Sequence, residues 1–258
     1  MLSTIKKTLI TAFVASSVLG VQVTASQADI DAEIARYIDV FNTQNHAAER
    51  LVMNKLVWAG YSSESLYDVI ATKLESVKNA DDKESKRQAS WYAKTLSMSG
   101  NEKYRVVLQD VATNSDNKKV RERAAAALDR LALYKIWNPI ISAGLEQAPA
   151  GLLEETRVKN ILTTNEHELL RIGVKRLYYA HLENTELVNL AKQRLASEWR
   201  LVDESNDFQL DSVAWLIKTI GAAGDASVIP LLEEIQNGSD IKKVKKYAKK
   251  TIKILQSN

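Results

Sequence analysis

The sequence from Gly224 to Leu255, GDASVIPLLEEIQNGSDIKKVKKYAKKTIKIL, contains the signals of two helices joined by a tight turn. A proline lies in the first turn of the first segment, where a helix tolerates its missing N–H group. The turn follows at residues 237–240, Asn-Gly-Ser-Asp, which are residue types that favour turns. Beyond it, apolar residues recur at helical spacing through Val244, Ala248 and Leu255. The stretch therefore predicts a helical hairpin.

The same pattern occurs earlier in the chain. Residues 91–131 align without a gap with residues 215–255, at a constant offset of 124 and with 12 identities. Composition alone gives roughly two or three identities over a segment of this length. The matched pairs are Trp91/Trp215, Lys94/Lys218, Thr95/Thr219, Gly100/Gly224, Leu108/Leu232, Ser115/Ser239, Asp116/Asp240, Lys118/Lys242, Lys119/Lys243, Val120/Val244, Ala124/Ala248 and Leu131/Leu255. The chain thus contains an internal repeat.

The order of landmarks in the second copy resembles the HEAT repeat, in the short form also found in the phycobilisome-lyase-like group. These landmarks are the proline in the first helix, an apolar pair, Asp240 in the turn, the Val-Lys dipeptide at 244–245 and Ala248. The resemblance implies an all-α fold, an α-solenoid in which antiparallel helical hairpins stack into a superhelix. HEAT-like modules generally act as non-catalytic binding scaffolds, since stacked helices create a long curved surface.

Helical periodicity continues along the rest of the chain, and no run of alternating apolar and polar residues predicts a strand. We expect one elongated body over residues 29–258, with an irregular insertion near 137–165. Within it, Trp137-Asn138-Pro139 predicts a new helix that starts at Asn138. The predicted helices are 29–41, 45–59, 62–77, one from the turn at 79–82 to Met98, 102–113, 117–134, 152–162, 166–182, 186–200, 207–222, 226–237 and 240–256.

Residues 1–28 are typical of a secretory signal peptide. Two lysines precede an uncharged run that starts at Thr8, and small residues follow, with possible cleavage after Ala25 or Ala28. A membrane anchor is the alternative, but the apolar run is short and diluted by threonine and serine, and no basic stop signal follows it. We therefore expect export to the periplasm of a Gram-negative bacterium.

Composition narrows the classes of function. The chain has no cysteine, which excludes a lipid-attached lipoprotein, thiol catalysis and cysteine-based metal sites. The formal net charge is +3, and residues 1–28 contain two lysines and no acid, so the remainder has +3 − 2 = +1. A nearly neutral, exported chain is not expected to bind nucleic acid.

Motifs for catalysis or metal binding are not found. The sequence has no Ser nucleophile motif, phosphate-binding glycine loop or metal-ligand spacing, and its three histidines are scattered. One HEAT-family enzyme, deoxyhypusine hydroxylase, holds two irons with several His-Glu pairs, of which only His167-Glu168 is matched here. We expect no catalytic residues, no metal and no cofactor. An enzyme with an unrecognised active site remains an alternative.

Aromatic residues give the first candidate contact site. Trp91 and Trp215 lie off the main apolar stripes of their helices, so something other than the partner helix has to cover them. Burial against a neighbouring repeat is one interpretation. The other is a concave groove in which exposed tryptophans and lysines contact a peptide or a glycan. For a protein partner, the predicted contacts are Trp91, Lys94, Tyr178, Tyr179, Trp215 and Lys218.

Charged residues give two further patterns. Acid–cation pairs five residues apart, such as Asp82/Arg87 and Glu166/Arg171, recur at helix starts, where we expect a structural role; a binding role requires the arginines to face open space. Seven lysines surround the apolar stripe of the last helix and predict either a solvated cap or contact with anionic lipid, lipopolysaccharide or an acidic partner. They are Lys242, Lys243, Lys245, Lys246, Lys249, Lys250 and Lys253.

These patterns together predict a non-catalytic protein-interaction scaffold or adaptor in the bacterial cell envelope, with another envelope protein or a peptide as its partner. This prediction rests on the resemblance to HEAT modules. The second hypothesis is a surface-associated protein that makes peripheral contact with an anionic membrane through its last helix.

Overall fold

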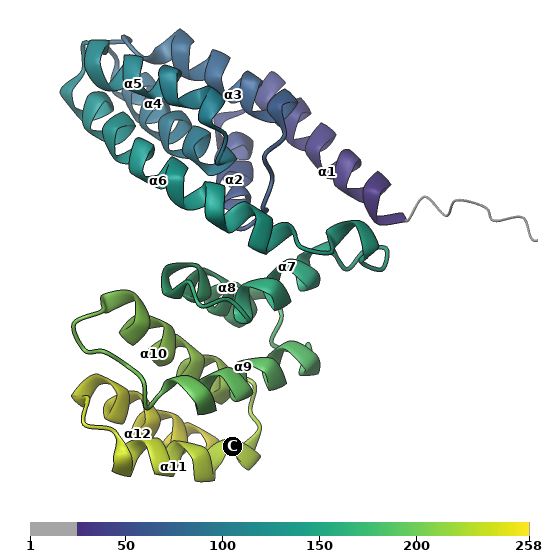
Figure 1. Ribbon diagram of the computed structural model, residues 1–258, viewed down its shortest axis with the longest axis vertical. Coiled ribbons are helices and arrows are strands. Elements are labelled where there is room, and N and C mark those ends of the chain that lie inside the picture. Colours follow the sequence, from purple (N-terminus) through teal and green to yellow (C-terminus); the bar gives the residue numbers. More distant parts are fainter. Residues whose placement is uncertain (1–24, 258) are drawn as a thin grey trace, which may run out of the picture.

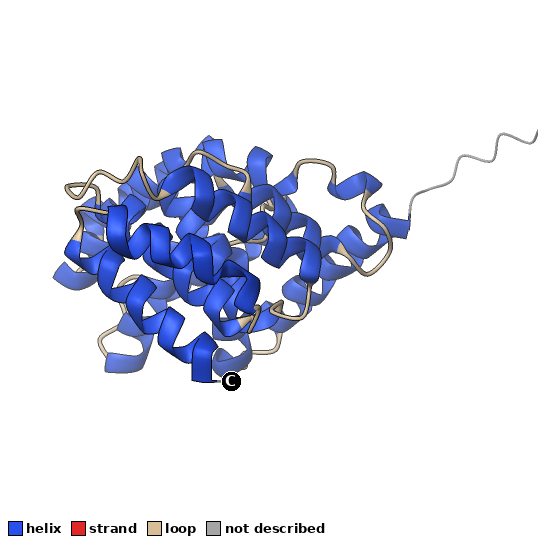
Figure 2. Ribbon diagram, turned by 90° about the horizontal axis from the view of Figure 1, so that it is seen from below, coloured by secondary structure: helices blue, strands red, loops and turns tan. Residues whose placement is uncertain are grey.

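The computed structural model describes residues 25–257, which form helices and no strand (Figure 1) (Figure 2). The predicted all-α fold is confirmed. The helices are α1 Ala25–Asn42, α2 His46–Leu56, α3 Glu64–Val77, α4 Lys83–Leu96, α5 Arg105–Asn114, α6 Lys118–Ser142, α7 Leu153–Leu162, α8 His167–Ala180, α9 Thr185–Glu198, α10 Asp207–Ala222, α11 Ile229–Gly238 and α12 Lys242–Ser257. Four short 3₁₀ segments join them: η1 Ser97–Ser99, η2 Glu102–Tyr104, η3 Leu145–Gln147 and η4 Ala226–Val228.

The predicted signal peptide lies mostly outside the described residues. Only residues 25–28 of it are described, and they form the first turn of α1, where the Gln27 side chain donates to Asp31 at 2.9 Å. Within the described part of the chain, no helix combines the length and the apolar character that a membrane span needs.

Consecutive helices pack against each other in pairs, and second helices of neighbouring pairs also contact one another. The first kind of contact joins α3 to α4, α5 to α6, α7 to α8, α9 to α10 and α11 to α12. The second kind joins α4 to α6 and runs on from α8 through α10 to α12. In Figure 1, α7 lies between the upper group of helices, α1–α6, and the lower group, α8–α12.

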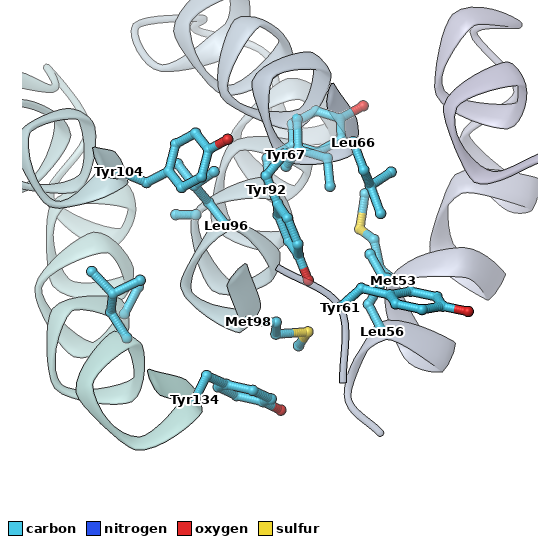
Figure 3. Close-up of a cluster of buried hydrophobic side chains, with 14 of the residues drawn as sticks. Met53, Leu56, Tyr61, Leu66, Tyr67, Tyr92, Leu96, Met98, Tyr104 and Tyr134 are labelled. Atoms are coloured by element: carbon cyan, nitrogen blue, oxygen red, sulfur yellow. The ribbon is translucent and has the colours of Figure 1, made fainter. Parts of the chain in front are cut away.

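Two hydrophobic cores correspond to these groups. The first core is built mainly from α1–α6 and the second from α7–α12. Figure 3 shows the first core, where Tyr92, Tyr104 and Tyr134 project among leucines and methionines. A buried tyrosine needs a partner for its hydroxyl. Here Tyr92 donates to Glu49 at 2.5 Å, Tyr104 to Asp68 at 2.9 Å and Tyr134 to the Val57 carbonyl at 3.1 Å.

The internal repeat is confirmed in three dimensions. The segments η2, α5 and α6 begin at residues 102, 105 and 118, and η4, α11 and α12 begin at 226, 229 and 242, which is the same offset of 124 each time. The repeated serines have one role, because each buried hydroxyl accepts a backbone N–H two residues on: Ser115 from Asn117 at 3.3 Å and Ser239 from Ile241 at 3.2 Å. Identical local chemistry therefore produces the same turn in both copies.

The prediction of a helix start at Asn138 is wrong. Helix α6 continues through Pro139 to Ser142, and Asn138 is buried inside it. Its side-chain amide faces the carbonyls of Tyr61, Met98 and Ser99 at 2.9–3.2 Å, so the asparagine joins three segments and does not cap a helix. Burial of Trp137 and Ile141 on either side stabilises this last turn despite the proline.

Candidate binding groove

A groove of about 950 Å³ lies between α4 and α6 and reaches the first turns of α8. We call it the basic groove, because its lining contains eight basic residues and only two acids, Asp81 and Glu168. Trp91, Ser90, Asn117 and two alanines complete it. The basic residues are Lys83, Lys86, Arg87, Lys94, Lys119, Arg123, Arg130 and Arg171.

Local sequence explains why these side chains share one surface. Asp82 caps α4 by accepting from the N–H groups of Glu84 at 3.0 Å and Ser85 at 2.9 Å. Asn117 caps α6 in the same way, from Lys119 at 2.9 Å and Val120 at 3.2 Å. Beyond each cap the lining residues follow at intervals of three and four, which places them on one helical face. That face contains Lys83, Arg87, Ser90, Trp91 and Lys94 on α4, and Lys119, Arg123, Ala126, Ala127 and Arg130 on α6.

The positive charge of the groove is largely uncompensated. Arg130 pairs with Glu168 at 2.9 Å, Arg87 with Glu84 at 2.5 Å and Arg171 with Asp211 at 3.5 Å. Among residues 25–257, the other five cations have no acidic partner within 4 Å; these are Lys83, Lys86, Lys94, Lys119 and Arg123. Like charges held close together repel one another, so the groove is an attractive site for an anion.

Burial and the neighbouring charges both act on the ammonium group of Lys94. Partial burial, together with the nearby positive charges of Arg130 and Arg123, lowers the pKa of the Lys94 ammonium below its usual value. An anionic group that enters the groove neutralises these neighbours and raises the pKa of Lys94 again.

Trp91 lies half-buried on the wall of the groove. The guanidinium of Arg87 lies 4.8 Å from the centre of its ring, and that of Arg50 lies 5.4 Å away. The structure therefore places Trp91 between the two expected situations: it is neither sealed inside the core nor fully exposed. Cations over the ring add positive potential at this wall.

The four remaining predicted contacts and Lys175 form a second group of side chains, which we call the aromatic cluster: Lys175, Tyr178, Tyr179, Trp215 and Lys218. The ring centres of Tyr178 and Tyr179 lie 5.5 Å and 6.0 Å from that of Trp215. Lys218 lies 4.1 Å from the Trp215 ring centre and 4.3 Å from that of Tyr178. The six residues that were predicted to form one contact site therefore lie in two places. Trp91 and Lys94 line the basic groove, and the other four belong to the aromatic cluster.

Other residues of the groove were not predicted as contacts. Lys83, Lys86, Arg123 and Arg130 recur at helical spacing on α4 and α6, but the sequence alone does not show that these two faces meet. Two arginines of the acid–cation pairs, Arg87 and Arg171, also line the groove, whereas a structural role was the first expectation for them and a binding role the alternative. Asp82 does have the expected capping role.

The seven lysines of α12 form a separate surface, the α12 lysine face. Lys243 pairs with Asp211 at 3.1 Å, and in the described part of the chain the other six have no acidic partner within 4 Å. Five of the seven border a shallow depression of about 560 Å³ together with Gln236. The apolar face of the same helix, with Val244, Ala248 and Leu255, is buried in the second core.

Neither the comparisons nor the side-chain clusters supply a function directly. Comparison of the chain with protein-family models, with curated proteins and with solved structures gave no match. Over residues 25–257, no group of three or more potential metal ligands comes together. Function therefore has to be inferred from the chemistry of the surfaces, among which the basic groove combines a concave wall with eight basic side chains.

Proposed function

We propose that this protein is a non-catalytic binding scaffold of the HEAT-like α-solenoid type and that it acts in the cell envelope. Its basic groove binds an acidic segment of a partner protein. One observation carries the proposal: among the described residues, five cations without an acidic partner line, together with Trp91, a groove of about 950 Å³. Such a surface attracts acidic partners and selects against basic ones.

The architecture supports a scaffold. Helical pairs pack in sequence order, second helices contact second helices, and one unit recurs at an offset of 124 residues with the same element starts. Repetition of this kind is typical of solenoids, whose stacked helices provide long binding surfaces. Support for export comes from the signal-peptide pattern of residues 1–28.

The dimensions of the groove suit an extended peptide. Lys83 and Lys94 mark the ends of the α4 wall, and a helix rises 1.5 Å per residue, so the wall is about 16 Å long. An extended chain of about five residues covers that length. Arginine guanidinium groups bind carboxylates with two parallel hydrogen bonds, which favours aspartate and glutamate side chains as ligands. An exported protein has little contact with nucleic acid, which is the competing polyanion.

The test uses the purified protein and a fluorescein-labelled peptide of alternating glutamate and aspartate, with binding measured by fluorescence anisotropy. We expect saturable binding that weakens as salt is added, because salt screens exposed charges. The double variant Lys119→Glu/Arg123→Glu should bind at least about 10-fold more weakly, since it removes two unpaired cations and adds two acids.

The matched control is Lys249→Glu/Lys253→Glu in the C-terminal half of α12, which changes the net charge by the same amount outside the lining of the groove. It should bind the peptide within about two-fold of the wild type. Equal losses in the two double variants would show a general charge effect and overturn the assignment to the groove. Tighter binding of a single-stranded oligonucleotide of equal charge would overturn the choice of an acidic protein segment.

A further inference from the structure

We infer that the aromatic cluster is a second subsite of the basic groove and that it binds an aromatic side chain of the same acidic segment. This inference rests on the proposed function. The partner segment would then differ from other acidic chains by an aromatic residue at a fixed spacing from its acidic residues.

One face of α8 connects the two sites. Arg171, Lys175 and Tyr178 follow one another at intervals of four and three, so they lie in a row along the helix. Arg171 lines the end of the basic groove, and the Lys175 ammonium lies 5.0 Å from the centre of the Trp215 ring. A ligand that leaves the groove at Arg171 therefore meets the aromatic cluster next.

Cations follow one another along this row, and the first of them, Arg171, pairs with Asp211 at 3.5 Å. Among the described residues, neither Lys175 nor Lys218 has a carboxylate within 4 Å. Partial burial and the neighbouring Arg171 lower the pKa of the Lys175 ammonium, as similar causes do for Lys94 in the groove. The acidic part of the ligand is attracted as far as the edge of the aromatic rings.

The rings are arranged to leave a surface open. Tyr178 stands at 88° to Tyr179 and at 74° to Trp215, so the rings meet edge to face and are not stacked on one another. Lys218 covers Trp215 and Tyr178 from one side. Tyr179 is 69% exposed, and no cation lies over its ring in the described part of the chain. It is the most exposed aromatic side chain among the described residues.

An exposed aromatic ring beside a half-buried tryptophan is suited to an aromatic ligand. Aromatic pairs in offset or edge-to-face contact stabilise a complex beyond the area that they bury. A large, rigid tyrosine also loses little conformational entropy when a ligand binds, which is why tyrosine is common at interaction sites. The aromatic cluster therefore favours phenylalanine, tyrosine or tryptophan in the partner.

The spacing of the two subsites sets the spacing in the ligand. Tyr178 and Tyr179 lie seven and eight residues beyond Arg171, which corresponds to about 11–12 Å along the helix. Extended peptide spans about 3.3 Å per residue. The aromatic side chain should therefore lie three to four residues from the acidic residue that binds Arg171, in one direction of the peptide chain or the other.

The test compares three labelled peptides: the acidic peptide alone, and the same peptide with a phenylalanine four residues beyond its last acid at either the N-terminal or the C-terminal end. We expect one of the two phenylalanine peptides to bind about three- to ten-fold more tightly than the acidic peptide. Tyr179→Ala should remove this gain and leave the affinity for the acidic peptide unchanged. Tyr179 is exposed, so the variant keeps its fold.

The control is Leu201→Ala, which truncates a residue that is equally exposed, at 68%, outside the cluster. It should keep the full gain from phenylalanine. A phenylalanine that adds nothing at either end, or a gain that survives Tyr179→Ala, would overturn the second subsite while leaving the groove in place. Failure of the acidic peptide to bind at all would instead reject the proposed function itself.

Discussion

Arg157 donates a hydrogen bond of 3.0 Å to the carboxylate of Glu33, which ties α7 to α1 across 124 residues of sequence. The arginine side chain is only 1% exposed, and the Tyr61 hydroxyl donates to the same glutamate at 2.8 Å. Helix α7 also packs on α6 and on α8. The pair therefore helps to hold α8, which forms the end of the basic groove, in its place beside the first group of helices.

Replacement of Glu33 should destabilise the protein and change its response to acid. Burial acts to raise the pKa of Glu33, but the charge of Arg157 and the hydrogen bonds from Tyr37, Tyr61 and Arg157 outweigh it, and the pKa is lowered. A lowered pKa contributes stability above the unfolded value of about 4.3, and that stability is lost as the pH falls below it.

We therefore expect Glu33→Gln to unfold more easily at pH 7, by about 3–5 kcal/mol, because it leaves Arg157 buried without an anion. Its stability should also fall less steeply than that of the wild type below about pH 4.3. Urea unfolding at several pH values measures both effects, with the exposed Glu183→Gln as the control. Parallel acid profiles for wild type and Glu33→Gln would contradict the prediction.

The repeated glycines Gly100 and Gly224 should differ in their tolerance of alanine. Both have positive φ angles, +60° and +77°, so alanine costs about 1 kcal/mol at either position. A β-carbon at Gly100 would also lie 2.6 Å from the backbone nitrogen of Lys135 on α6, whereas at Gly224 nothing lies within 4 Å. Gly100→Ala should therefore cost about 2–4 kcal/mol in urea unfolding, since α6 has to move. Equal losses in the two variants would argue against close packing of α6 on Gly100.

Tryptophan fluorescence should respond to the charge of the quencher. Trp58, Trp137 and Trp199 are buried, while Trp91 and Trp215 are half-buried beside cations. Iodide is attracted to these two sites and caesium is repelled. We expect iodide to quench more strongly than caesium at equal concentration, and Trp91→Phe/Trp215→Phe to remove most of the difference. Iodide quenching that the double variant leaves unchanged would mean that ions do not enter the groove or the aromatic cluster.

The α12 lysine face should bind anionic vesicles weakly and in a salt-dependent way. Each lysine near an anionic surface contributes about 1 kcal/mol. We expect co-sedimentation with vesicles of mixed anionic and neutral phospholipid, and a loss of about 100-fold or more in Lys246→Gln/Lys249→Gln/Lys250→Gln/Lys253→Gln. The groove variant Lys119→Glu/Arg123→Glu serves as the control and should still co-sediment. Equal recovery of wild type and quadruple variant would identify the face as a solvated cap.

Helix positions were predicted well because their signals are local. The caps of η2, η4 and α6 and the apolar spacing of α5, α6, α11 and α12 act within four residues, and the two copies start at the same offset. The end of α6 was predicted wrongly, since the Trp-Asn-Pro sequence indicates a helix start when it is considered alone. Only the tertiary structure shows that the buried Asn138 side chain donates hydrogen bonds to the carbonyls of Tyr61, Met98 and Ser99 and does not cap a helix.

By itself, the sequence determined the all-α class and the repeat. It also showed that Trp91 and Trp215 lie off the apolar stripes of their helices and that lysines surround the stripe of the last helix. These features depend on neighbouring residues, through periodicity, capping and composition. Only the tertiary structure decided that the cations of α4, α6 and α8 line one groove together with Trp91, and that Tyr178 and Tyr179 contact Trp215. It also decided that Glu33 pairs with Arg157. The physical reason is that such contacts depend on the angles and distances at which whole helices pack, and these are set by the combined volume of many buried side chains.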